Sequence, residues 1–583
     1  MRVCRPSEIS LFLDARVRRG VLRFFCVLLA LGCAADAARA QLLPGSVQPG
    51  REREQLLERR ISPRVTPGGV AISMPSTEAP AGAAQTLLTI RRVQVTGSTV
   101  YTEEQLAPLY RDQLNRQVTL EVVYDIAKRI TAKYGADGYV LSRAIVPPQE
   151  LTPGGATIRI QVIEGYVSRV EWPREKLARY RDFFTDYTAK IVANRPTNIR
   201  TLERYLLLAN DLPGLKFTTT LQPSKTEQGA AVLVVEVTEK PIDVLARFDN
   251  RGTKARGPYQ FLLAPTFNNL SGTHEAITFA YAGTTQIEEL QFAGFSYRHV
   301  LTSEGLTAFA NASYAWGRPG TPQLRELDYK TRSTIVEAGV YYPVIRTREA
   351  NLTVTSFAYM SDNYSFTNLD WFDPFQVDRL RGIRGRVDAD VADKLNGINQ
   401  FSFTVSRGIE GFGSTDNGNL LASRLVGRVD YSKFDGLVSR LQPLFGQFSA
   451  LVSAYGQYSG NSLLVPEQCG YGGRVFGRAY DPSELLGDHC WMASAELRYD
   501  IPGGALPVPD TQFYGYADKG RVYIIERAVG TALTNPNNLK GASAGGGVRL
   551  KWQNYFNVDL SANKAVEGPR DDWRFFFITT ARY

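Results

Sequence analysis

The chain ends in WRFFFITTARY at positions 573–583, a stretch rich in strand-forming residues that closes on an aromatic carboxy-terminus. At the opposite end, residues 1–40 combine a basic n-region, an apolar run at 24–31 and a small-x-small site at 38–40, which is the pattern of a secretory signal peptide. The apolar run is too short to span a bilayer. An exported chain with a terminal strand of this kind favours a bacterial outer-membrane β-barrel. A lipidated Cys33 is the alternative for the amino-terminus, but residues 30–32 fit that pattern poorly.

The region from Asp243 onward shows alternating strands and no helical period. Phe401, Phe403 and Val405, for example, alternate with small polar residues, as expected for strands with one face toward lipid. We predict sixteen antiparallel strands, at 243–250, 259–268, 274–283, 289–298, 306–316, 333–343, 351–360, 379–389, 397–408, 423–433, 446–458, 491–500, 511–520, 542–552, 555–564 and 573–583. An even number places both ends of the barrel in the periplasm. A soluble all-β protein is the alternative.

The composition supports a barrel and excludes several other classes. Tyr and Phe number 29 each, although the hydrophobic content is only 44%, because only every second residue of a membrane strand faces lipid. The net charge of +9 comes partly from arginines of the signal region, and the sequence shows no nucleic-acid-binding motif that would explain the rest. The three histidines are dispersed, without metal-ligand spacing, and Gly545–Gly547 lacks the Lys-Ser/Thr of a phosphate loop. We therefore expect no enzyme activity, metal, cofactor, nucleotide or nucleic acid.

Residues 86–240 predict two copies of one small α+β unit. In 86–167, Thr102 and Gln105 form a capping box at a first helix, and Ile126, Ile130 and Tyr134 recur on one face of a second. The predicted order is β-α-α-β-β, and 168–240 repeats it, with Asn198 as a helix cap. Before these units, a polar helix at 51–60 within segment 41–61 is followed by a linker at 62–85 that is rich in Pro, Gly, Ala, Ser and Thr.

The longest predicted external loop spans 460–489. It holds Cys469 and immediately precedes Cys490, and these are the two cysteines left after the signal peptide is removed. An even pair in an oxidising compartment favours a disulfide, with two free thiols as the alternative.

The chain resembles the B-family outer-membrane transporters of two-partner secretion, of the haemolysin and filamentous-haemagglutinin type. The resemblance rests on the repeated units, on the barrel and on the stretches 134–139, 163–165 and 249–252. It implies an all-β transmembrane barrel of about 16 strands at 241–583, preceded by two α+β POTRA domains at 86–167 and 168–240. It also implies that the helix in 41–61 plugs the pore and is tethered by the linker.

The family's signature tetrad, Val-Arg-Gly-Phe/Tyr, lies at the tip of the sixth external loop, which folds back into the barrel. The matching residues here are Gly477, Arg478, Ala479 and Tyr480, so the arginine and the aromatic residue are kept and the other two are replaced. Residues 513–520 resemble the wall segment that holds the arginine. The resemblance therefore implies that Asp518 is the partner of Arg478, in a wall segment that ends at Gly520. A planar guanidinium can form two parallel hydrogen bonds with such a carboxylate.

The resemblance implies export of a large secreted partner, such as an adhesin or a haemolysin, which crosses the barrel unfolded. The barrel would lie in outer-membrane lipid, and the POTRA domains in the periplasm would capture the client by sheet-edge addition. An insertase that assembles other barrels is the alternative within the same superfamily. A passive porin is a third possibility, against which the periplasmic units argue.

Overall fold

The computed structural model describes residues 45–56, 65, 78–150, 155–368, 373–503, 510–525, 538–553 and 555–583. The predicted signal peptide at 1–40, residues 41–44 and 57–61 of the plug-helix segment and most of the linker at 62–85 lie outside these residues. Among the described residues, no helix has both the length and the apolar character needed to cross a membrane.

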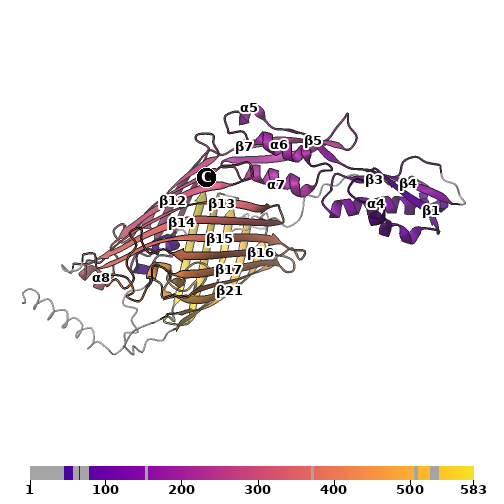
Figure 1. Ribbon diagram of the computed structural model, residues 1–583. Helices are drawn as coiled ribbons and strands as arrows, with labels where there is room; N and C mark the ends of the chain where they lie inside the picture. The colour runs from indigo at the N-terminus through magenta and orange to yellow at the C-terminus, as the bar shows by residue number, and fades with distance from the viewer. Residues whose placement is uncertain are drawn as a thin grey trace, which may run out of the picture. The chain divides into compact units, whose positions relative to one another are not determined.

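A closed antiparallel barrel of sixteen strands forms the carboxy-terminal part, as predicted. Figure 1 shows wall strands from β12 to β17 side by side, and the last strand, β25, closes the barrel on the first, β8. The strands are β8 Ile242–Asp249, β9 Gln260–Asn268, β10 Glu275–Thr284, β11 Gln291–Val300, β12 Thr307–Gly317, β13 Lys330–Arg346, β14 Ala350–Phe366, β15 Gln376–Ala392, β16 Ile398–Gly408, β17 Ser432–Pro443, β18 Phe448–Ser459, β21 His489–Ile501, β22 Asp510–Tyr523, β23 Asn538–Trp552, β24 Phe556–Glu567 and β25 Trp573–Arg582.

Alternation along each strand separates a lipid face from a polar lumen. On β16, Phe401, Phe403 and Val405 are exposed on the outer face, whereas Ser406 is buried on the lumen side. The closing pair brings the two ends of the barrel together, since the Val244 amide donates to the Tyr583 carbonyl at 3.0 Å. Both ends of the barrel therefore lie on the side at which the amino-terminal domains enter.

The tenth predicted strand, 423–433, was wrong. The wall strand at this point is β17, Ser432–Pro443, and the residues before it form a connection that turns inward. Val429 and Tyr431 are buried against Leu463 and Leu464 of the long loop. Their alternation imitates a strand, but their partners lie inside the barrel rather than in the wall.

The first amino-terminal domain packs helices on a four-stranded sheet of order β2-β1-β4-β3. Its elements are β1 Leu87–Thr96, α3 Glu103–Leu106, β2 Gln117–Thr119, α4 Leu120–Ala136, β3 Arg143–Ile145 and β4 Ala156–Ile163. The predicted capping box of Thr102 and Gln105 is present at α3. Ile126, Ile130 and Tyr134 of α4 lie in the core of this domain, as their spacing predicts.

The second domain has a three-stranded sheet of order β5-β7-β6 covered by helices. Its elements are β5 Tyr166–Glu171, α5 Arg174–Leu177, α6 Phe184–Ala193, α7 Ile199–Asn210, β6 Leu215–Pro223 and β7 Ala230–Glu239. The predicted cap is confirmed, because the Asn198 side chain accepts from the Arg200 amide at 3.0 Å. In both domains the first strand pairs in parallel with the last, which repeats one topology.

Candidate functional site

The loop between β18 and β21, residues 460–488, lies inside the barrel and is called loop 6 below. It contains the short helix η5 Val465–Glu467 and a small hairpin, β19 Cys469–Tyr471 and β20 Leu485–Gly487. Tyr471, Ala479 and Tyr480 are buried against wall residues such as Val522. Loop 6 therefore has a packed core with the barrel wall, which a solvated surface loop lacks.

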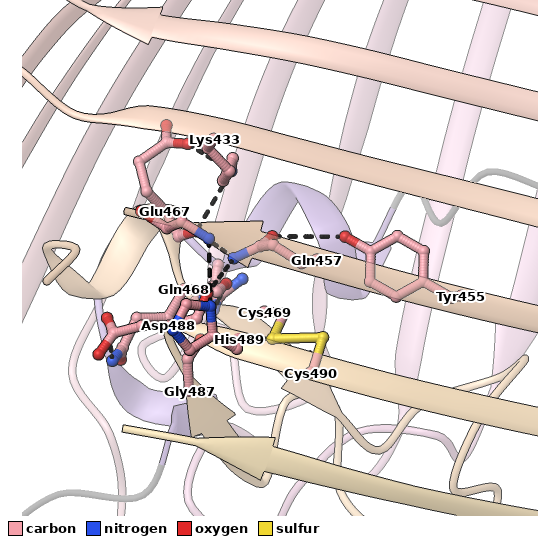
Figure 2. The surroundings of a disulfide bond; sticks show 12 residues. Lys433, Tyr455, Gln457, Glu467, Gln468, Cys469, Gly487, Asp488, His489 and Cys490 are labelled. Carbon is pink, nitrogen blue, oxygen red and sulfur yellow. Dashed lines mark hydrogen bonds and ion pairs between the residues drawn. A yellow bond between two sulfur atoms is a disulfide. The ribbon is translucent and has the colours of Figure 1, made fainter. Parts of the chain in front are cut away.

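A disulfide joins loop 6 to the wall. Cys469 of β19 is bonded to Cys490 of β21, with their Cα atoms 6.4 Å apart (Figure 2). The bridge fixes the point at which the hairpin of loop 6 leaves the wall strand. It leaves the tip, 477–480, free of covalent attachment.

Arg478 points into a pocket of the wall that several side chains share. Its guanidinium donates to the Glu496 carboxylate and, at 3.0 Å, to Ser494 Oγ, and it lies 3.9 Å from the centre of the Tyr516 ring. Asp518, the expected partner, accepts from the Arg478 backbone amide at 3.2 Å and lies 3.5 Å from Arg478 Nε. The structure thus brings Arg478 and Asp518 together, but the direct side-chain hydrogen bond goes to Glu496.

Two glycines leave room for the ring of Tyr471. A Cβ atom on Gly520 would lie 2.5 Å from that ring, and one on Gly477 would lie 2.7 Å from it. Gly477 also has a φ of +69°, which side-chain-bearing residues rarely adopt. A glycine at 477 is thereby explained, since the tight turn brings the loop backbone against its own aromatic residue.

The other two residues of the tetrad attach the tip to the last strands. The Tyr480 hydroxyl donates to the carbonyls of Ala542 and Glu567. Ala479 is fully buried, and its carbonyl accepts from Arg574 at 3.2 Å. The tip is therefore held by backbone and side-chain hydrogen bonds to β23, β24 and β25.

The base of loop 6 is held by buried ion pairs. Glu467 receives Lys433 Nζ and the Arg384 guanidinium, each at 2.6 Å, and Figure 2 shows Lys433 and Glu467 close to the disulfide. Asp488 pairs with Arg424 at 2.5 Å. These ion pairs lie next to the apolar contacts of Leu463 and Leu464, and their main role is to specify a position rather than to add net stability.

The amino-terminal segment, residues 45–56, is a second insertion in the barrel. It consists of η1 Gly45–Val47 and α2 Glu52–Leu56, and Arg51, Glu52, Gln55 and Leu56 of the expected plug helix are buried. Arg256, from the loop between β8 and β9, donates to the carbonyls of Ser46 at 2.9 Å and Val47 at 2.8 Å, and pairs with Glu52 at 3.0 Å. Both side chains of that ion pair are almost completely buried.

Further contacts fix α2 along its length. Arg53 pairs with Glu337 on the lumen side of β13 at 2.9 Å, and Leu56 packs against wall residues that include Phe292. Arg51 donates to the Gln468 carbonyl of loop 6. The amino-terminal segment therefore touches both the wall and loop 6.

The loop between β8 and β9, residues 250–259, contacts both inserted parts and is called the first hairpin loop. Arg251 donates to the carbonyls of Arg478, at 2.8 Å, and Gly473. Asp249, at the end of β8, pairs with Arg474 of loop 6 at 2.6 Å. Arg251 and Arg256 thus hold loop 6 and the amino-terminal segment from one short loop.

The space left in the lumen is a cavity of about 740 Å³ lined by the amino-terminal segment, loop 6 and wall residues. Charged groups of both signs face it, including Arg53, Glu337, Arg384 and Lys433. Among the described residues, no group of three or more His, Cys, Asp or Glu side chains could hold a metal ion. The amino-terminal segment and loop 6 thus occupy much of the lumen, and charged side chains line the space that they leave.

The family model for haemolysin secretion/activation proteins ShlB/FhaC/HecB matches residues 228–548, more than half of the chain. The chain belongs to this family. A second model, for the ShlB-type POTRA domain, matches residues 88–165. The protein is therefore a two-partner secretion transporter of the outer membrane, with its POTRA domains in the periplasm and a large exoprotein as its partner.

Full-length relatives agree with this assignment. The Heme/hemopexin transporter protein HuxB of Haemophilus influenzae (strain 86-028NP) is 21% identical over 563 residues, which cover 94% of this chain and 97% of HuxB. The Outer membrane transporter CdiB of Dickeya dadantii (strain 3937) is 23% identical over 80% of this chain and 81% of its own length. The solved structure of CdiB from Escherichia coli matches with a TM-score of 0.63 at 18% identity, covering 98% of this chain and all of CdiB, and so shares the fold.

Proposed function

We propose that the transporter rests in a closed state in which the amino-terminal segment and loop 6 together block the lumen. Export of the client, a large unfolded secreted protein such as an adhesin or a haemolysin, then requires both parts to move. The Arg256–Glu52 pair carries this proposal, because a charged pair buried between a wall loop and an inserted helix has no role in an empty pore. Only polar contacts and a small apolar patch at Leu56 have to be broken for the helix to leave.

Conductance in planar bilayers tests the closed state. Deletion of residues 45–56 should convert rare, brief openings into a persistently open channel, because it removes every contact of α2. The matched control replaces residues 66–77 by a Gly/Ser linker of equal length, which keeps the tether and α2. Unchanged conductance after the deletion would rule out the segment as a plug.

We propose that loop 6 is positioned through Arg478 with Asp518 and Glu496, and that the Cys469–Cys490 bridge limits its movement to the tip. An ion pair in a partly wet lumen adds little net stability, so its role is to fix one loop position among several. Glu496 serves as an anion for Arg478, Arg498 and Arg549 at once. The Glu496 carboxylate therefore ties the seated tip to two further arginines of the wall.

We propose that the second POTRA domain offers the docking edge for the client. Among the described residues, β6 pairs only with β7, so the other edge of its nine residues is unpaired. Its side chains at Lys216, Thr218 and Thr220 are exposed. An extended client segment can add to such an edge through backbone hydrogen bonds, which suits recognition of an unfolded chain.

Photo-cross-linking in the periplasm tests capture. A photoreactive residue at Thr219 of β6 should trap one large exported protein, whereas the same residue at the exposed Lys176 of α5 serves as the control. A spread of outer-membrane barrel precursors at Thr219 would favour the insertase alternative. Equal yields at both positions would contradict edge addition.

A further inference from the structure

Four arginines gather on the outer face of the barrel, on β13, β15 and β16, with β14 lying between β13 and β15. Alternation fixes their direction: on β15, Asp378 and Leu380 are fully buried toward the lumen, so Arg379 and Arg381 point outward. By the same alternation, Arg332 follows the buried Thr331 and Arg407 follows the buried Ser406. The strand register sets Arg332 opposite Tyr364, Arg379 opposite Asp362 and Arg407 opposite Ile383, so the arginines form one cluster.

This arginine cluster lies at the external end of the apolar belt. β13 and β15 begin on the external side of the barrel, because β8 leaves the periplasm and the strands alternate in direction. Toward the periplasm from the cluster, the outward residues become apolar at Val336, Met360 and Ile383. Trp316, stacked on Tyr314 and opposite Arg332, marks the interface by its aromatic ring. The cluster therefore lies at the headgroup level of the outer leaflet.

Three of the four arginines contact neutral groups among the described residues. Arg379 donates to the Tyr364 hydroxyl at 3.0 Å, Arg407 donates to Ser432 Oγ at 2.6 Å, and Arg332 lies 5.1 Å from the centre of the Phe366 ring. Within the described part of the chain, only Arg381 pairs with a carboxylate, that of Asp362, at 2.5 Å. Counted over these described residues, four positive charges and one negative charge leave a local excess of three positive charges above an apolar surface.

We propose that this face binds the phosphate groups of the outer leaflet's glycolipid, lipid A. Planar guanidinium groups match phosphate oxygens in pairs, and the exposed arginines have donors left for them. The apolar belt directly below would accept the acyl chains of the same molecule, so the surface matches a phosphorylated amphiphile. A free anion would use only the arginines, and a soluble partner would not cover the belt.

Lipid binding to the purified full-length protein in detergent, measured by native mass spectrometry, tests the proposal. Wild-type protein should hold lipid A with two phosphates far better than enzymatically dephosphorylated lipid A. The variant R332Q/R379Q/R407Q should lose roughly 100-fold in affinity, from about fivefold for each of the three basic residues near an anionic surface. Lysine at the same three positions should restore much of the binding, because it keeps the charge.

The matched control is R92Q/R111Q/R116Q, which removes the same charge from exposed positions of the first POTRA domain. It should bind lipid A like the wild type, and heat-modifiable migration on gels should show that both triple variants keep a folded barrel. Wild-type affinity in R332Q/R379Q/R407Q, or equal binding of dephosphorylated lipid A, would overturn the proposal. Inorganic phosphate binding as tightly as lipid A would also overturn it, since the site would then be a free-anion site.

Discussion

At the scale of single residues, the loop-6 pocket places two carboxylates beside Arg478, of which the sequence predicted only Asp518. Glu496 accepts directly from the guanidinium, whereas Asp518 accepts from the backbone amide and faces the charge at 3.5 Å. We expect Glu496→Gln to destabilise the seated tip more than Asp518→Asn, with a cost of about 3–5 kcal/mol for leaving a buried charge without its partner. Open probability in planar bilayers should rise in the same order. The double variant R478Q/E496Q should recover part of the loss, and a larger effect of Asp518→Asn would contradict this assignment.

Glu164 of the first POTRA domain is a second residue with a defined role. Partial burial favours the neutral form of Glu164, but hydrogen bonds to its carboxylate outweigh this effect and lower its pKa below the usual 4.5. The Thr99 amide donates one of these bonds at 2.7 Å, and the Tyr134 hydroxyl donates another at 2.8 Å. A lowered pKa stabilises the fold above pH 4.5, and this contribution is lost as the pH falls through the folded-state pKa. Glu164→Gln should cost about 2 kcal/mol at pH 7 and less at pH 3.

Hydrogen exchange of the Thr99 and Val100 amides, corrected for the intrinsic pH dependence, measures this effect. Protection should fall in the variant at pH 7, and variant and wild type should converge at low pH. Exposed Glu150→Gln in the same domain is the control. A constant difference between the two proteins across this range would contradict the role of the charge.

At the scale of elements, the amino-terminal segment depends on Arg256. We expect Arg256→Ala to release this segment, because it removes two backbone contacts and leaves Glu52 buried without its cation, a cost of about 3–5 kcal/mol. A cysteine at Ser46, which is buried in the wild type, reports the release. Its labelling by an external maleimide should accelerate roughly 100-fold or more, since each 1.4 kcal/mol shifts the population tenfold.

The control for this release is Arg318→Ala. Arg318 is an exposed arginine of the external loop between β12 and β13, and its loss should leave the labelling rate unchanged. Slow labelling in Arg256→Ala would show that other contacts, such as Arg53 with Glu337, suffice to hold the segment.

The elements also show what sequence patterns can and cannot predict. Period-two alternation and the terminal strand predicted the barrel because lipid and lumen impose opposite polarity on neighbouring residues. The same rule misplaced the tenth strand, since Val429 and Tyr431 alternate like wall residues but pack on loop 6. Glu496 and Arg256 gave no signal at all. They resemble any polar lumen or loop residue, and their partners lie 18 and 204 positions away, so only the folded barrel reveals them.

At the scale of the whole molecule, the first hairpin loop links the two parts that fill the lumen. Arg251 holds the backbone of loop 6, Arg256 holds the amino-terminal segment, and Arg51 of that segment contacts Gln468 of loop 6. Because the two parts share a support and touch each other, departure of one weakens the position of the other. We therefore expect their release to be cooperative, as two ligands of one site would be.

A double-mutant cycle of Arg251→Ala and Arg256→Ala measures this coupling. If the two releases were independent, their effects on the closed-to-open free energy in planar bilayers would add. The shared loop and the Arg51 contact instead predict that the effect of the double variant is about 1–3 kcal/mol smaller than the sum of the two single effects. The first substitution already removes part of the stabilisation that the two parts give each other. Arg318→Ala with Arg251→Ala is the matched pair, because Arg318 is exposed in the external loop between β12 and β13 and its loss should add nothing to the effect of Arg251→Ala. Additive effects in both pairs would mean that plug and loop open separately, and a client would then have to displace each in its own step.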